Sequence, residues 1–335
     1  MIVVAHPRVA PDADRSTSDV LDQVELVAGA LAALGERFET VAIDGGRVWE
    51  TLAGRPDVVV FNLLEFPPGA PQLQTAATAV LELLALPFTG AAAGPMWLST
   101  DKLATRALLA SSGLPVAAGG RFEPGCPALL DVVPPPWILK PAFEDASLGL
   151  EGDPVCATVA RAVARGHDLA ARFPGQPIVL EHFLPGREFN VALLEDAAGV
   201  EVLPVAEIEF VDFPPGTPAL VGYEAKWQVD SFEYRHTVRR FPSPDADGAL
   251  LDELAGLARS AWRACGLAGY GRVDLRLGSA GELIVLEVNP NPDLSPELEI
   301  ARAAASAGIG YTSLIGWLVD QALGKAGAPA LSRDV

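Results

Sequence analysis

The chain has 335 residues, half of them hydrophobic, and a formal net charge of −19 at pH 7. This length and composition allow two or three packed units around a large apolar core. The acidic charge and the lack of a basic run exclude the positive surface that nucleic acids and anionic membranes require, so we expect neither as a partner. No signal-peptide pattern and no apolar run of about 18 residues occurs, which predicts a cytoplasmic protein.

Cysteine and lysine are both used sparingly. The cysteines, Cys126, Cys156 and Cys265, are far apart and form no CxxC, so neither a disulfide framework nor a thiolate metal site is indicated. A lysine ammonium on its flexible stem suits a phosphate that moves during a reaction, which makes the few lysines candidate phosphate contacts, with compositional drift as the alternative. They are Lys102, Lys140, Lys226 and Lys325.

The first third of the chain predicts a parallel α/β unit. Apolar runs at residues 2–5, 40–43 and 58–61 are typical of buried strands. Helical spacing of apolar residues follows residue 18 and recurs over residues 73–84. Strands that alternate with helices in this way predict a parallel sheet, and we assign residues 1–95 to this N-terminal domain.

The remainder predicts a mixed α+β arrangement. After a helix at 101–111 we expect strands at 137–140, 178–183, 188–194 and 202–208, and helices at 250–265 and 296–323. Proline and glycine between 211 and 244 predict a long mobile loop, of the kind that often forms a lid. We assign residues 96–180 to a central domain and 181–330 to a C-terminal domain. No internal repeat is found.

Residues 272–277 and 284–289 alternate polar and apolar side chains and predict a β-hairpin. With Ala280-Gly281 as a two-residue turn, the apolar pairs are 273 with 288, 275 with 286 and 277 with 284. The same register places Asp274 opposite Glu287 and Arg272 opposite Asn289, because side chains repeat every second residue. Two carboxylates, an amide and a guanidinium therefore share one face.

This polar face has two interpretations. Facing carboxylates repel unless a cation or a proton lies between them, and oxygen ligands from Asp274, Glu287 and Asn289 suit Mg²⁺. The alternative is a solvated face on which Arg272 neutralises Asp274. The run Asn-Pro-Asn-Pro at 289–292 ends the strand abruptly and presents amide oxygens there, which favours the metal site.

Arg272-Val273-Asp274 with the run Leu-Glu-Val-Asn-Pro-Asn-Pro at 286–292 resembles the ATP-grasp ligases, most closely the D-alanine–D-alanine ligases. Four further segments resemble that family in the same order: 81–90 with 101–102, 139–149, 181–189 and 223–226. Each motif alone is weak, but their order covers nearly the whole chain. The resemblance implies an ATP-grasp fold, α/β and α+β, preceded by a Rossmann-like parallel-sheet domain.

The resemblance also implies roles for individual residues. Lys102 and Lys140 would hold the phosphates of ATP, Ser147 and neighbouring backbone N–H groups would cover them, and Lys226 would close from the lid as a catalytic residue. The adenosine would contact the hinge residues Glu181, His182, Phe183, Leu184 and Glu188. Of these, His182 would have a packing or hydrogen-bonding role and would not act as a base.

For the hairpin, the resemblance implies metal binding and catalysis. Asp274, Glu287 and Asn289 would hold two Mg²⁺ ions, with Mn²⁺ as a substitute, and Arg272 would stabilise the oxyanion of a tetrahedral intermediate. The expected reaction passes the γ-phosphate of ATP to a carboxylate, and an amine then displaces phosphate from the acyl phosphate.

The chain departs from the family where substrates are expected. The glycine-rich first loop is replaced by residues 6–11, Asp19 stands near the family's glutamate, and Ala146 replaces a serine. The other departures are Trp227 for a tyrosine, Asp293 for a glycine and Leu298 for a serine. Asp293 is a candidate partner for a substrate amine. Trp227 either contacts a bulky substrate or packs on the protein itself.

These observations predict an ATP-dependent carboxylate–amine ligase whose substrates, expected to be amino acids, differ from two D-alanines. Two alternatives stay open: a non-catalytic ATP-binding protein and an ATP-grasp kinase that releases a phosphorylated product. Retention of the oxyanion arginine, Arg272, argues against simple binding. A homodimer is compatible with the sequence.

Overall fold

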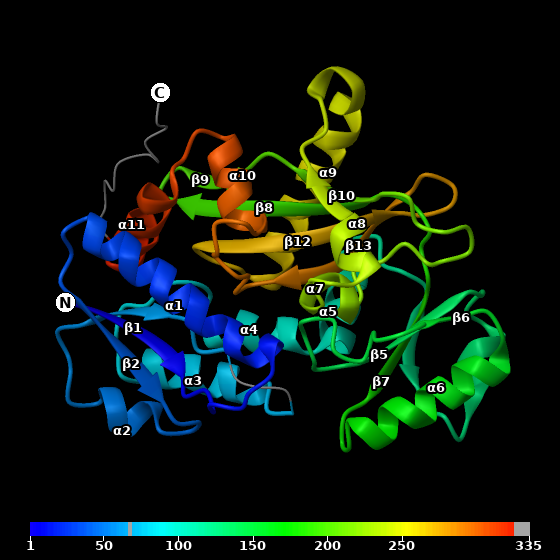
Figure 1. The fold of residues 1–335 in the computed structure, drawn as a ribbon, viewed down its shortest axis with the longest axis horizontal. Helices are drawn as coiled ribbons and strands as arrows, with labels where there is room; N and C mark the ends of the chain where they lie inside the picture. The colour runs from blue at the N-terminus through cyan, green and yellow to red at the C-terminus, as the bar shows by residue number, and fades with distance from the viewer. Residues whose placement is uncertain (66–68, 325–335) are drawn as a thin grey trace.

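The computed structural model describes residues 1–65 and 69–324. Three sheets with flanking helices make up the molecule: the β1–β3 unit, the β5–β7 unit with α6, and a large sheet around β8, β12 and β13 (Figure 1). The mixed α/β architecture confirms the predicted fold class. None of the helices in the described ranges is long and apolar enough to span a membrane.

The N-terminal sheet is parallel, as the sequence predicts, with strand order β2-β1-β3. Its strands are β1 (Ile2–Pro7), β2 (Phe38–Ile43) and β3 (Val59–Asn62). Helix α1 (Arg15–Ala33) buries the apolar residues that predicted it, and Asp14 caps its N-terminus by accepting from the Thr17 backbone N–H. Three more helices follow: α2 (Val48–Leu52), α3 (Gln72–Leu83) and α4 (Ala93–Thr100).

The central sheet is antiparallel with order β4-β7-β5-β6. Helix α5 (Lys102–Ser111) leads into it and is capped by Asp101, whose side chain accepts from two backbone N–H groups. A short 3₁₀ turn, η1 (Pro127–Asp131), lies beside β4. The remaining elements are β4 (Gly119–Phe122), β5 (Trp137–Pro141), β6 (Val155–Cys156), α6 (Val159–Arg172) and β7 (Ile178–His182).

The C-terminal sheet has the order β11-β10-β8-β12-β13, with β9 on β8. The predicted strand at 202–208 is wrong: β9 (Gly199–Val202) and β10 (Ala206–Phe210) are separate strands, because Pro204 has no N–H to donate to a ladder. The strands that carry the site are β8 (Glu188–Asp196), β12 (Tyr270–Leu277) and β13 (Leu283–Asn289). Helix α9 (Pro244–Cys265) packs against them.

The segment 211–244, expected as a long mobile loop, contains regular elements. They are α7 (Tyr223–Trp227), α8 (Phe232–His236) and β11 (Thr237–Arg240), and β11 pairs with β10 at the sheet edge. The single helix expected at 296–323 is two, α10 (Glu299–Ser306) and α11 (Tyr311–Ala322), because Gly308 adopts a left-handed φ of 80°. Helices α10 and α11 share one apolar core with α1 and β1.

Candidate functional site

Strands β12 and β13 carry the polar face that the sequence predicts. Arg272 lies opposite Asn289 and Asp274 opposite Glu287. Beyond Asp274 the predicted apolar pairs are wrong: a β-bulge shifts the register, so that Leu275 pairs with Val285 and Leu286 is the extra residue. The bulge places Leu286 among the side chains that line the neighbouring pocket.

Arg272 lies at the centre of a buried charge network. Its Nε and Nη2 donate to the two carboxylate oxygens of Asp274 at 2.7 and 2.8 Å, and its Nη1 donates to Glu299 at 3.3 Å. Asn190 on β8 also donates to Asp274, at 2.7 Å. Arg272 therefore does neutralise Asp274, but the face is buried and not solvated. Burial works against the arginine's charge, yet Asp274 and Glu299 raise the pKa of Arg272.

Cations from four different elements, α5, β5, α7 and β12, converge on Glu287. Burial opposes its ionisation, but the charges of Lys102, Arg272, Lys226 and Lys140 together lower the pKa of the Glu287 carboxyl. A carboxylate held ionised among ammonium groups is an arrangement that also suits phosphate oxygens and their metal ions.

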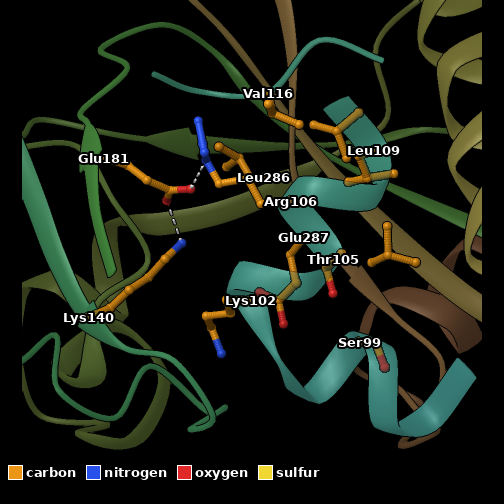
Figure 2. Close-up of a pocket in the computed structure, with 12 residues that line it drawn as sticks. Ser99, Lys102, Thr105, Arg106, Leu109, Val116, Lys140, Glu181, Leu286 and Glu287 are labelled. Atoms are coloured by element: carbon orange, nitrogen blue, oxygen red, sulfur yellow. Dashed lines mark ion pairs between the residues drawn. The ribbon is translucent and has the colours of Figure 1, made fainter. Parts of the chain in front are cut away.

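A pocket open to solvent lies between α5, β5, β7 and β13. Figure 2 shows Glu181 between Lys140 and Arg106, with Lys102 and Glu287 farther along the same pocket. Glu181 pairs with Lys140 at 2.9 Å and with Arg106 at 3.7 Å. Burial disfavours the ammonium of Lys140, but Glu181 raises the pKa of that lysine.

The loop after β5 turns sharply at residues with a left-handed backbone. Ala146 and Ser147 both adopt left-handed φ values, 55° and 60°. Gly149 follows with φ 83°, and a Cβ there would lie 2.5 Å from the ring of Pro141, so only glycine fits. Lys102 donates to the Glu144 carbonyl at the start of this loop. The N–H groups of residues 148–150 already donate to acceptors within the same loop.

The segment that carries Lys226 is closed over this loop. The Ser147 hydroxyl donates to the Val221 carbonyl at 2.8 Å, and the Trp227 indole N–H donates to the Ala146 carbonyl at 2.9 Å. Lys226 lies between these contacts and has no ion pair within 4 Å among the described residues. Trp227 thus has a hydrogen-bond partner within the protein, while its contact with a substrate stays a prediction.

In the hinge, residues 181–184, two backbone N–H groups donate hydrogen bonds within the described part of the protein and one does not. The N–H groups of His182 and Phe183 donate to the carbonyls of Ala118 and Pro136, both at 2.8 Å. His182 Nδ1 donates to the Pro134 carbonyl at 3.0 Å, which fits a hydrogen-bonding role. In the part of the chain that the structure describes, the Leu184 N–H has no acceptor.

Glu188, at the start of β8, forms a buried ion pair that the sequence did not reveal. Arg276 lies opposite it on β12 and donates through Nη1 at 3.0 Å. The guanidinium also lies over the ring of Phe183, 5.0 Å from its centroid, and donates to the Ala219 carbonyl of the lid segment. Burial raises the pKa of Glu188 and lowers that of Arg276, although each partner opposes the shift.

Three carboxylates meet beside the end of β13. Burial, followed by the charge of Asp293, raises the pKa of Glu65 to about 8. Burial raises that of Asp293 to about 7, and Asp19 adds to the rise. Asp19 pairs with Arg15 at 3.1 Å, but the described residues offer Glu65 and Asp293 no ion pair. Leu298, the fourth candidate substrate contact, is the N-cap of α10.

Several residues of this site were missed at the level of sequence: Glu65, Arg106, Asn190, Arg276 and Glu299. Strand alternation places Arg276 on the face of Arg272 and Asp274, so that signal was present. The others come from elements that no local pattern connects to the hairpin.

The residues present fit ATP with Mg²⁺. No three His, Cys, Asp or Glu side chains group as a metal site within the described ranges. The hairpin instead offers two carboxylates and an amide, which leaves coordination positions for phosphate oxygens and water, as Mg²⁺ requires beside a nucleotide.

Comparisons with known proteins agree with this geometry. A family model described as the D-ala D-ala ligase C-terminus matches residues 126–320. A D-alanine–D-alanine ligase of Gluconobacter oxydans is 34% identical over 315 residues, covering 90% of this chain and 95% of its own. One from Caulobacter sp. is 31% identical over 320 residues, covering 94% and 92%.

A solved structure shares the fold. The ATP-complexed D-alanine–D-alanine ligase of Bacillus anthracis superimposes with a TM-score of 0.72 and 17% identity, covering 96% of this chain and 97% of that one. This structural similarity supports the ATP-grasp fold, and the sequence relatives and the family model show the family. The chain therefore belongs to the D-alanine–D-alanine ligase family of ATP-grasp enzymes.

Proposed function

We propose that this enzyme joins a carboxylate to an amine through an acyl phosphate, on substrates other than two D-alanines, one of which carries a positive group beside Asp293. Family membership makes it an ATP-dependent ligase that forms a C–N bond. The observation that carries the proposal is the convergence of lysines from separate elements on Glu287, next to Arg272.

The nucleotide lies in the pocket of Figure 2 in this proposal. The free N–H of Leu184 donates to the adenine ring, and Glu181 accepts from its amino group. Glu188 accepts from the ribose hydroxyls, held in place by Arg276. Lys140 and Lys102 contact the phosphates from two sides of the pocket, since both line it.

The lid and the hairpin surround the reacting groups. Ser147 and the N–H groups of its loop cover the phosphates, while Lys226 offsets the charge that moves with the γ-phosphate. Asp274, Glu287 and Asn289 would hold two metal ions, which would neutralise phosphate charge. The closed lid excludes water, which protects an acyl phosphate from hydrolysis.

Amide formation then depends on Arg272. The amine nitrogen attacks the acyl carbon, the carbonyl oxygen gains negative charge, and the C–O bond to phosphate breaks as the amine releases its proton. A guanidinium beside that oxygen lowers the barrier because it acts where charge develops. Arg272 is buried and already ionised, so it needs no reorganisation of solvent.

The carboxylates beside β13 support a substrate with a positive group. Asp293 lies close enough to Glu65 to raise its pKa, Asp19 raises that of Asp293, and neither Glu65 nor Asp293 has a basic partner among the described residues. A substrate ammonium placed there would relieve their repulsion, whereas a substrate carboxylate would add to it.

A screen of amino-acid pairs of both hands, including diamino acids, tests the proposal through ADP release and the mass of the product. We expect phosphate release only when a carboxylate and an amine are both present. Release with the carboxylate alone, giving a stable phosphorylated product, would favour a kinase. Binding of Mg²⁺-ATP without turnover on any pair would favour a non-catalytic protein.

A further inference from the structure

A buried carboxylate outside the hairpin reaches its central arginine. Glu299 lies in the first turn of α10, is 8% exposed, and accepts from Arg272 Nη1 at 3.3 Å through Oε2. Its other oxygen, Oε1, accepts from Nη2 of Arg239 on β11. Burial opposes its ionisation, but Arg272 and then Arg239 lower the pKa of Glu299 to about 2. Glu299 is therefore a fixed negative charge shared by two arginines.

The network around Arg272 is divided between two carboxylates. Asp274 accepts from Nε and Nη2 of Arg272, and these two hydrogen bonds occupy both of its oxygens. Of the Arg272 nitrogens, Nη1 is the one that donates to Glu299. An arginine held by Asp274 alone would compete directly with any other cation for that carboxylate. An arginine with a second counter-ion keeps a neutralising partner when Asp274 is engaged elsewhere.

Arg239 is the second arginine that contacts Glu299. Its Nε is buried and has no hydrogen-bond partner among residues 1–65 and 69–324, and its Nη2 donates to Glu299. Strand β11 ends the lid segment and pairs with β10 at the sheet edge. Glu299 thus connects the base of the lid to the central arginine.

We propose that Glu299 is the positioning residue of Arg272: Arg272 and Asn190 occupy the oxygens of Asp274 in this structure, and Glu299 retains the guanidinium when Asp274 exchanges these contacts for a metal ion. The proposal rests on the proposed roles of Arg272 and Asp274. Without the carboxylate at 299, Asp274 is the one carboxylate left in hydrogen-bond contact with Arg272 among the described residues, and the two side chains bind each other more tightly.

Glu299→Gln tests this, with Glu297→Gln as the matched control, because Glu297 is exposed and two residues away on the same segment. We expect Glu299→Gln to weaken Mg²⁺ binding in the presence of ADP, measured by titration calorimetry, about 10- to 100-fold, the usual loss when a residue behind a metal ligand is removed. The control should bind Mg²⁺ as the unmodified enzyme does. Equal Mg²⁺ affinity in Glu299→Gln would overturn the proposal, whether or not a substrate pair is known.

Turnover separates positioning from a structural role. We expect kcat to fall by about 10- to 100-fold while KM for ATP stays within about twofold. In an Arg272→Lys variant, adding Glu299→Gln should lower kcat by less than a further factor of about two. The effects of residues that act through one group are not additive. Additive losses would contradict the proposal. If Glu299→Gln does not fold, Glu299→Asp keeps the charge and should retain near-normal Mg²⁺ affinity; a loss equal to that of Asp274→Asn would overturn it.

If the unmodified enzyme binds Mg²⁺-ADP but turns over no substrate pair, the proposed function fails while the calorimetric comparison still decides the role of Glu299. If turnover is found and Glu299→Gln matches the control in Mg²⁺ affinity and kcat, only this inference fails.

Discussion

Replacement of Arg276 by methionine should destabilise the enzyme strongly, and the effect should be reversible at a second site. Arg276 is 4% exposed and donates to Glu188 at 3.0 Å and to the Gly186 carbonyl at 3.1 Å. Methionine fills similar space but leaves the carboxylate of Glu188 buried without its cation. Such a change costs about 3 to 5 kcal/mol, because the desolvation of the remaining charge is no longer offset.

A thermal melt measures this effect. A loss of about 3 to 5 kcal/mol in the free energy of unfolding corresponds to a fall in Tm of roughly 6 to 20 °C for a domain the size of residues 181–330. Arg276→Met with Glu188→Gln should recover most of the loss, since no buried charge is then left alone. Arg121→Met is the control, because Arg121 forms an exposed ion pair with Glu123, worth less than about 1 kcal/mol. A Tm for Arg276→Met no lower than that of the control, or no recovery in the double variant, would refute this reasoning.

Three further predictions concern the lid and the acidic side of the site. Trp227→Phe keeps the ring but removes the indole donor to Ala146, so KM for ATP should rise about 2- to 10-fold, whereas Trp49→Phe at an exposed site should leave it unchanged; equal KM values would exclude a closing role. Asp293→Asn should raise KM for the positively charged substrate without changing KM for ATP, and an unchanged substrate KM would show that Asp293 does not contact it. Burial and Asp293 raise the pKa of Glu65 from 4.5 to about 8, so the folded protein holds a proton that the unfolded chain releases. The stabilisation by this proton is full below about pH 4.5 and is lost as the pH rises through about 8. Between about pH 5 and 8, Tm should therefore fall less in Glu65→Gln than in the unmodified protein. An equal fall of Tm in the two proteins would contradict this prediction.

Much of the fold was predictable because the determining patterns are local. Helix α1 and strands β1, β2 and β3 follow from apolar periodicity alone. The errors arise where one residue changes the geometry: Pro204 interrupts a ladder, Gly308 ends a helix, and the bulge after Asp274 shifts a register. A bulge depends on the pairing of whole strands, which a sequence pattern does not encode.

The site divides in the same way. Sequence by itself determined that Arg272, Asp274, Glu287 and Asn289 share one face, since strand alternation and a hairpin turn require only neighbouring residues. The lysines were indicated by their scarcity and their motifs, apart from Lys325, which lies outside the described residues.

Only the tertiary structure decided which charges neutralise which. Arg272 is shared by Asp274 and Glu299, and Glu188 is paired with Arg276. Glu65 lies beside Asp293, although the two are more than two hundred residues apart in the sequence. The strength and even the sign of an electrostatic effect depend on distance and burial, and packing sets both. Residue types in order along the chain thus indicate the chemistry, whereas the contacts that position it come from elements that meet only in the folded protein.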